Sequence, residues 1–258
     1  MYNPIEMLSV EDLGFGYGSD LTIEDIAFDI RGSEVIGIVG PNGSGKTTTM
    51  KCLNRILESK VGRILVNGTD VRSMTRMEIA RNLAYVPQNA GSNMSMPTVF
   101  EVVMMGRAPH GMWNQPTEDD ELVWRELERM ELIPLANKRF NELSSGQVQR
   151  TLIARALVQE AEILLLDEPT SNLDIRYQIE VMNMVRSIVK ERGISACAII
   201  HDINLAMRYC DRVLLMDDGR IVDFGETADV LTVGSIRDVF GVETEIVERN
   251  GCMNVLYL

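Results

Sequence analysis

Residues 35–47 read VIGIVGPNGSGKT, a continuous apolar run that leads directly into a glycine-rich turn. An apolar run of this length is typical of a strand that is covered on both faces of a sheet. The turn matches the pattern Gly-x-x-x-x-Gly-Lys-Thr, and it lies between a predicted strand and a helical pattern, as phosphate binding requires. Its glycines let successive backbone N–H groups converge on phosphates, and the helix N-terminus adds positive potential.

The side chains of this turn suit a nucleoside triphosphate. Lys46 can reach the β and γ phosphates, and Thr47 can ligate Mg²⁺. The candidate ATP-binding residues here are Gly40, Pro41, Asn42, Gly43, Ser44, Gly45, Lys46, Thr47 and Thr48. The long motif in this context argues against a glycine turn that binds nothing, but a nucleotide kinase or a GTPase would share it.

Composition limits the remaining classes. The 258 residues, 45% of them hydrophobic, are enough for one α/β domain with sub-lobes. The net charge of −13, from 38 acidic and 25 basic residues, repels a polyphosphate backbone and weighs against nucleic acid as a partner. No apolar run approaches the ~18 residues of a membrane-spanning helix, and the N-terminus lacks an export signal, so we expect a cytoplasmic protein. The four cysteines are far apart in sequence, which indicates buried small side chains and not a metal site.

Strand patterns change along the chain. Residues 26–30 and 63–68 alternate as half-buried antiparallel strands do. Continuous apolar runs at 163–166, 196–200 and 213–216 alternate with helical patterns, and this alternation is typical of a mostly parallel sheet.

Helical patterns suggest an inserted lobe. One predicted helix starts after the cap Asp174 and ends before Gly193, with one apolar face formed by Ile175, Ile179, Met182, Val185 and Val189. Between about 89 and 160 helices dominate, including 118–131, for which Thr117 is the predicted cap and Asp120 lies three residues on. We expect this segment to form a helical lobe.

Polar residues at strand ends are the catalytic candidates. Asp167 and Glu168 follow the run 163–166, where Asp167 can hold Mg²⁺ through water and Glu168 can polarise an attacking water. His201 follows the run 196–200 and can donate a hydrogen bond to the γ-phosphate. Its place at the same sheet edge outweighs the more common structural role of a lone histidine. Without the phosphate loop, the two acids would indicate only a strand reaching the surface.

Two further residues gain meaning only from this context. Gln88 has an amide that can contact metal or water, although a lone loop glutamine is unremarkable. Tyr17 offers an aromatic face for adenine, and packing within a turn is an almost equally good interpretation of it.

Taken together, these motifs resemble the ABC ATPase family over nearly the whole chain. The shared segments, in order, are residues 40–47, Gln88, the signature sequence LSSGQ at 143–147, Asp167-Glu168, the sequence SNLD at 171–174, and His201. The resemblance implies an α/β fold: a P-loop NTPase (RecA-like) core with an N-terminal antiparallel β lobe and an inserted α-helical lobe. It implies an ATPase domain over 1–242, with the helical lobe at about 89–160 and a short C-terminal extension at 243–258.

The resemblance also implies a dimer of two such subunits, each ATP lying between one subunit's loop and the other's signature segment. The signature residues Ser144, Ser145, Gly146 and Gln147, together with Asp174, would then complete the ATP site across the interface. Catalysis would use Glu168, His201, Lys46 and Gln88, and Mg²⁺ would be held by Thr47, Gln88 and, through water, Asp167. Ser145 stands where the family usually has glycine, so we expect slower or weaker closure of the dimer.

Partners and cargo follow from the same resemblance. The stretch 97–110 looks like that of importers of iron-siderophores, haem and cobalamin, and it would line the groove for a helix of the transmembrane permease subunits. A substrate-binding protein would act at one remove, and the chain would sit peripherally on the cytoplasmic face of the membrane. The alternatives are a soluble ABC ATPase, for example in iron-sulfur cluster assembly, and a regulatory module without turnover, against which Glu168 and His201 argue.

Overall fold

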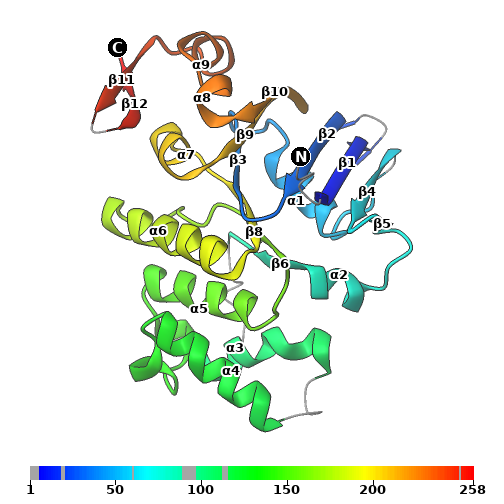
Figure 1. The fold of residues 1–258 in the computed structure, drawn as a ribbon, viewed down its shortest axis with the longest axis vertical. Coiled ribbons are helices and arrows are strands. Elements are labelled where there is room, and N and C mark those ends of the chain that lie inside the picture. The colour runs from blue at the N-terminus through cyan, green and yellow to red at the C-terminus, as the bar shows by residue number, and fades with distance from the viewer. Residues whose placement is uncertain (1–5, 19–20, 60, 89–96, 112–115, 250) are drawn as a thin grey trace.

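The computed structural model describes residues 6–18, 21–59, 61–88, 97–111, 116–249 and 251–258, and its centre is a six-stranded sheet (Figure 1). The strand order is β10-β9-β3-β8-β7-β6, and all neighbours are parallel except β10, which pairs antiparallel with β9. The strands are β3 (Val35–Val39), β6 (Leu83–Val86), β7 (Ile163–Leu166), β8 (Ser195–Ile199), β9 (Arg212–Asp217) and β10 (Arg220–Glu226). Every residue of β3, β7 and β8 is buried, which confirms the predicted parallel sheet.

A second sheet is antiparallel and lies at the N-terminal end of the chain. Its order is β2-β1-β4-β5, and the strands are β1 (Glu6–Phe15), β2 (Ile23–Arg31), β4 (Val61–Val66) and β5 (Thr69–Asp70). Exposed and buried residues alternate along much of β2, as predicted for a half-buried strand. The N-terminal β lobe is therefore confirmed.

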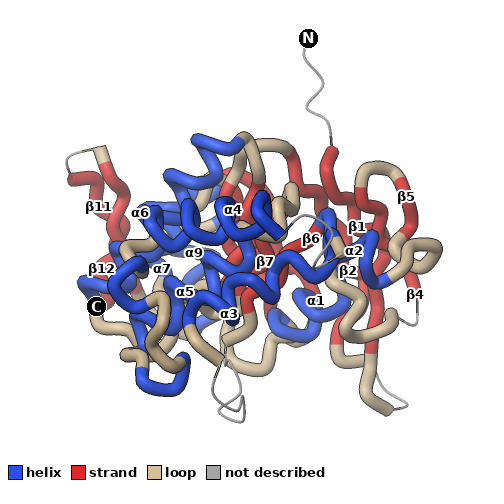
Figure 2. Tube along the Cα trace, turned by 90° about the horizontal axis from the view of Figure 1, so that it is seen from below, coloured by secondary structure: helices blue, strands red, loops and turns tan. Residues whose placement is uncertain are grey.

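The two faces of the central sheet belong to different hydrophobic cores. Ile36 and Ile38 of β3 face a core shared with the antiparallel sheet and α1 (Lys46–Leu53). Val35 and Val39 face the other core, which the helices cover. Because successive side chains of a strand point to opposite faces, one apolar run serves both cores. Figure 2 shows most of the helices over one part of the molecule and strands β1, β2, β4 and β5 over another.

Helices α3, α4 and α5, which come between β6 and β7, lie together at one end of the molecule, the lower part of Figure 1. Helices α3, α4 and α5 contact one another there. The helical segments up to β7 are α2 (Arg76–Asn82), α3 (Val99–Met104), η1 (Met105–His110), α4 (Pro116–Arg129), η2 (Ile133–Leu135), η3 (Phe140–Glu142) and α5 (Ser145–Leu157). Those after β7 are α6 (Ile175–Arg192), α7 (Ile203–Tyr209), α8 (Thr227–Val230) and α9 (Val233–Phe240).

Helix α6 has the predicted ends but not the whole predicted face. Asp174 caps its N-terminus by accepting from the Tyr177 N–H, and Gly193 closes the C-terminus with a left-handed φ of 69°. Ile175, however, is 75% exposed, because the helix reaches the buried core only from Val181 onward. The prediction for Ile175 was therefore wrong.

Three other details depend on tertiary packing. Helix α4 begins at Pro116, so Thr117 lies inside it and not at its cap. The C-terminal residues form a hairpin of β11 (Thr244–Arg249) and β12 (Cys252–Tyr257), an element that the sequence did not indicate. Cys52, Cys197 and Cys210 are free and buried as predicted, and burial raises the pKa of the Cys52 thiol to about 12.

A buried ion pair joins α4 to the end of α6. The Glu126 side chain is fully buried, and its Oε1 accepts a hydrogen bond from Arg192. Its Oε2 lies 3.9 Å from the Arg129 Nε. A buried carboxylate loses its hydration, so it depends on such partners for its stability.

Replacing Arg192 with methionine should destabilise the protein by about 3–5 kcal/mol, since Glu126 is left buried without its main partner. Urea unfolding followed by circular dichroism measures this loss. The control is Arg176→Met, which removes an exposed pair with Glu180 and should change the midpoint little. Equal losses in the two variants would contradict the importance of the buried pair.

Candidate active site

The glycine-rich loop connects β3 to α1, and its glycines are sterically required. Gly45 has a left-handed φ of 94° and directly precedes α1, whose N-terminus has no side-chain cap. A Cβ on Gly40 would lie 2.1 Å from the Met216 carbonyl oxygen, and one on Gly45 would lie 2.4 Å from the Ile23 side chain. An uncapped helix start behind such a loop leaves backbone N–H groups for an anion.

Lys46 is folded over this loop. Its Nζ donates to the Gly40 carbonyl at 2.9 Å and to the Pro41 carbonyl at 2.6 Å, and lies 3.5 Å from the Ser44 Oγ. Burial lowers the pKa of the ammonium, and the negative charge of Glu168 opposes this shift. The loop carbonyls therefore hold the cation at the place where phosphates would enter.

Asp167 gathers two hydroxyl groups at the end of β7. Its Oδ1 lies 3.3 Å from the Thr47 Oγ1, and its Oδ2 accepts from the Tyr85 hydroxyl at 2.7 Å. Burial and the neighbouring Asp167 carboxylate raise the pKa of Tyr85. Carboxylate and hydroxyl oxygens are the hard ligands that Mg²⁺ prefers, so the contacting oxygens of Asp167 and Thr47 fit the ion. Sequence reasoning missed Tyr85, although its place in the strand before Gln88 was a usable signal.

Glu168 is held between residues that follow two other strands. Its Oε2 accepts a hydrogen bond from Gln88, and its Oε1 lies 2.8 Å from the His201 Nε2. Its φ of 53° is left-handed, and its carbonyl accepts from both the N–H and the Oγ of Ser171. The structure thus brings Glu168 and His201 together, as expected from their places at strand ends, and it adds Gln88 to them.

The signature segment starts a different helix. Ser144 caps α5: its Oγ accepts from the Gln147 N–H at 3.4 Å, while the Gln147 Oε1 accepts from the Ser144 N–H at 3.1 Å. Gly146 packs on the Tyr177 ring, where an added Cβ would be 3.4 Å from a ring carbon. Ser145 is exposed at the first position of α5, so no tight space surrounds it within one chain.

These signature residues are not joined to the phosphate loop. Among the described residues, no hydrogen bond links 144–147 or Asp174 to 40–47, and α5 and α1 lie in different parts of the molecule (Figure 1). Tyr17 is also open to solvent, with 70% exposure and its ring edge-on to Phe15 at 5.1 Å. One chain therefore forms part of the expected ATP site, and the signature candidates and Asp174 lie apart from its phosphate loop.

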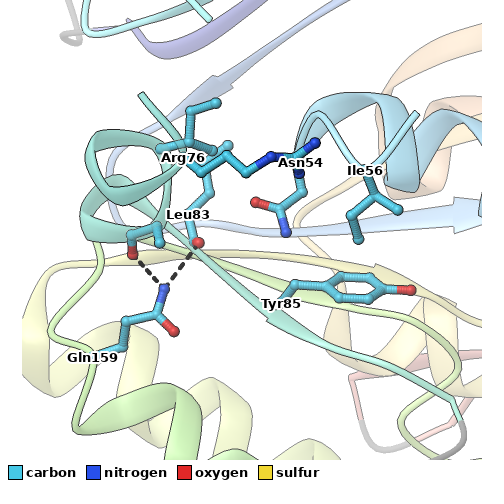
Figure 3. Close-up of a pocket in the computed structure, with 8 residues that line it drawn as sticks. Asn54, Ile56, Arg76, Leu83, Tyr85 and Gln159 are labelled. Atoms are coloured by element: carbon cyan, nitrogen blue, oxygen red, sulfur yellow. Dashed lines mark hydrogen bonds between the residues drawn. The ribbon is translucent and has the colours of Figure 1, made fainter. Parts of the chain in front are cut away.

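A pocket of about 290 Å³ lies beside the site, between the end of α1, α2 and β6 (Figure 3). It is lined by Asn54, Ile56, Arg76, Ile79, Ala80, Leu83, Tyr85 and Gln159. The Gln159 amide donates to the Ala80 and Leu83 carbonyls, which fixes one wall. The Tyr85 ring lines the pocket while its hydroxyl contacts Asp167, so the pocket wall and the carboxylate site share one side chain.

The stretch 97–110 runs next to this pocket. It forms α3 and η1, and η1 contacts α2, where the Arg81 Nε donates to the Pro109 carbonyl at 2.9 Å. Residues 89–96, which complete the expected groove, lie outside the described part of the chain. Within the described ranges, no helix combines the length and apolar character needed to cross a membrane.

Comparison with known proteins gives a consistent result. A family model described as ABC transporter matches residues 23–171. An uncharacterized ABC transporter ATP-binding protein of Methanocaldococcus jannaschii is 41% identical over 95% of each chain. The iron(3+)-hydroxamate import ATP-binding protein of Bacillus subtilis is 36% identical, over 93% of this chain and 90% of that protein. The hemin import ATP-binding protein of Bordetella avium is also 36% identical, over 93% and 94%.

Solved structures agree with this family. An inward-facing conformation of a putative metal-chelate type ABC transporter superposes with a TM-score of 0.85 and 28% identity, covering 98% of each chain. The phosphate loop, the paired acids and the fold described above therefore occur in a chain that belongs to the ABC transporter ATP-binding family, whose members hydrolyse ATP to power transport.

Proposed function

We propose that this chain energises the import of an iron-siderophore, haem or cobalamin, acting as a homodimer at the cytoplasmic face of a membrane. The observation that carries the catalytic part is the Glu168 carboxylate, held between Gln88 and His201 beside the loop that carries Lys46. The cargo class is supported by the sequence of 97–110 and by the iron(3+)-hydroxamate and hemin import relatives.

In the proposed reaction, water attacks the γ-phosphorus in line, and the bond from that phosphorus to the ADP oxygen breaks. Glu168 accepts a hydrogen bond from the water and polarises it, and the proton that the water loses passes to the released phosphate. Lys46 and His201 stabilise the charge that develops on the phosphoryl oxygens. Bound Mg²⁺, for which Thr47 and Asp167 are the fitting ligands and Gln88 a further candidate, supplies charge neutralisation on the phosphates.

The separation of the signature segment from the phosphate loop supports the dimer. Ser144 and Gly146 start α5, so the N–H groups and dipole of that helix can meet the γ-phosphate bound by a second copy. Asp174 and the exposed Tyr17 are assigned to the same composite site. Closure of two copies on ATP would bring these groups together, and hydrolysis would release them.

The pocket of Figure 3 is our candidate for the docking of a permease helix. Ile56 at its edge is 45% exposed, and Met105 of the neighbouring stretch is 41% exposed, so apolar surface is available to a partner. Tyr85 connects this pocket to Asp167, which gives a short physical route between the partner and the ATP site. A substrate-binding protein would act on the far side of the membrane.

Glu168→Gln should reduce ATP turnover by about 10²–10⁴-fold while leaving ATP binding intact, because the amide cannot polarise water as a carboxylate does. Light scattering should then detect a dimer with MgATP but not with ADP. Turnover at the wild-type rate would overturn the role of Glu168, and a persistent monomer would mean that closure needs the membrane partner or is impaired by Ser145.

Ser145→Gly should speed turnover or strengthen ATP-driven dimerisation, since Ser145 is exposed in one chain and would be confined only when a second copy closes on it. Steady-state hydrolysis by Ser145→Gly alone measures the effect on turnover. Light scattering of the Glu168→Gln, Ser145→Gly double variant with MgATP measures the effect on dimerisation. Unchanged values in both assays would contradict our assignment of Ser145 to the interface.

Ile56→Glu should leave hydrolysis by the isolated subunit unchanged and abolish its capture by detergent-solubilised permease subunits, because a charge at the pocket edge opposes apolar docking. Val222→Glu is the matched control, since Val222 is an exposed apolar residue of β10, away from the pocket. Equal loss of capture in both variants would argue against the pocket. A wild-type chain that is never captured would favour the soluble ABC ATPase.

A further inference from the structure

The C-terminal hairpin is packed on the protein by the inner face of its two strands. Ile246 of β11 lies opposite Val255 of β12, and Val255 is 2% exposed. Both side chains join the core on the helical side of the central sheet. Both views place β12 beside α7, and the two elements are in contact (Figure 1, Figure 2).

Asn204 of α7 forms hydrogen bonds to this hairpin through both the oxygen and the nitrogen of its side-chain amide. Its Nδ2 donates to the Val255 carbonyl at 3.1 Å, and the Val255 N–H donates to its Oδ1 at 2.7 Å. The side chain therefore completes the backbone hydrogen bonding of β12 as a neighbouring strand would. Helix α7 has only seven residues, so its position depends on tertiary contacts of this kind.

The same asparagine is tied to the N-terminus of α7. The Asp202 carboxylate caps the helix by accepting from the Asn204 N–H at 2.8 Å and the Leu205 N–H at 3.3 Å. Tyr257 of β12 lies close enough to this cap that, besides burial, the Asp202 charge raises the pKa of its hydroxyl. The hairpin thus contacts the helix at Asn204 and approaches its cap as well.

His201 immediately precedes this cap. On one side, the Ile200 N–H donates to the Ile38 carbonyl at 3.1 Å, which fixes the chain to β3. On the other side, α7 begins at Ile203, so only His201 and Asp202 connect the sheet to the helix. With so short a connection, a shift of α7 moves the backbone of His201, whose Nε2 is 2.8 Å from Glu168.

We propose that Asn204 is a positioning residue for ATP hydrolysis. Its two hydrogen bonds to the C-terminal hairpin hold α7 in place. The position of α7 in turn fixes the direction in which His201 faces Glu168 and the γ-phosphate. The proposal rests on the role of His201 proposed above. It assigns to the C-terminal hairpin a function in turnover that is separate from nucleotide affinity, because Asn204 has no contact with the phosphate loop in the described structure.

The first test is Asn204→Leu, which keeps a similar volume and removes both amide hydrogen bonds. We expect kcat to fall by about tenfold with the KM for ATP unchanged, as for an interaction that matters mainly in the transition state. Val123→Ala is the control, since it removes buried side-chain volume in α4, away from α7 and the hairpin; it should lower the melting temperature and leave kcat unchanged. A wild-type kcat for Asn204→Leu would overturn the proposal.

A double-mutant cycle separates positioning from general stability. If Asn204 acts through the imidazole, Asn204→Leu should have no further effect on kcat in a His201→Gln background. If His201→Gln lowers kcat and Asn204→Leu lowers it again by the same factor as in the wild type, the role of Asn204 is overturned and that of His201 stays intact. A wild-type rate for His201→Gln would overturn both. If Asn204→Leu does not fold, Asn204→Ser, whose hydroxyl is too short to span both bonds, replaces it in the same cycle.

Discussion

The site depends on one constraint, the parallel pairing of β6, β7 and β8 in register. Val86 pairs with Leu166, and Leu166 pairs with Ala198, so the three strands end at the same edge of the sheet. Gln88 and Glu168 each lie two residues beyond these positions, and His201 lies three beyond. Hydrogen bonds of the sheet backbone thereby place side chains that are far apart in sequence within contact of one carboxylate, as is general for the carboxyl edge of parallel sheets.

Hydrogen bonds and ion contacts at this edge hold the two acidic side chains in place. Glu168 accepts a hydrogen bond from Gln88 and lies 2.8 Å from the His201 Nε2, and its charge opposes the lowering of the Lys46 pKa by burial. Asp167 is satisfied separately by Thr47 and Tyr85. Two adjacent acids can therefore have different tasks, since each has its own set of hydrogen-bond donors.

Contacts beyond this edge connect the site to the rest of the molecule in two directions. Through Tyr85 it reaches the pocket between α1, α2 and β6, and through His201 and α7 it reaches the C-terminal hairpin. The signature segment lies on neither path, because α5 presents its N-terminus from another part of the chain. Contacts inside one subunit therefore position the catalytic side chains, and in the proposed dimer a second copy supplies the signature segment.

Much of this could be predicted from sequence because it rests on local patterns. The phosphate loop is a contiguous motif with fixed spacing, the buried strands are continuous apolar runs, and the ends of α6 are marked by Asp174 and Gly193. Strand-end positions also allowed Glu168 and His201 to be placed together, since parallel strands share an edge.

Only the tertiary structure decided the features that depend on what surrounds a residue. Ile175 follows the helical period of α6 and is nevertheless 75% exposed, because the buried residues of that helix begin only at Val181. The roles of Tyr85 and of the Asn204 amide depend on partners 82 and 51 residues away in the chain. A single side chain carries no pattern from which such a partner could be inferred, whereas periodicity and motif spacing are properties of the sequence itself.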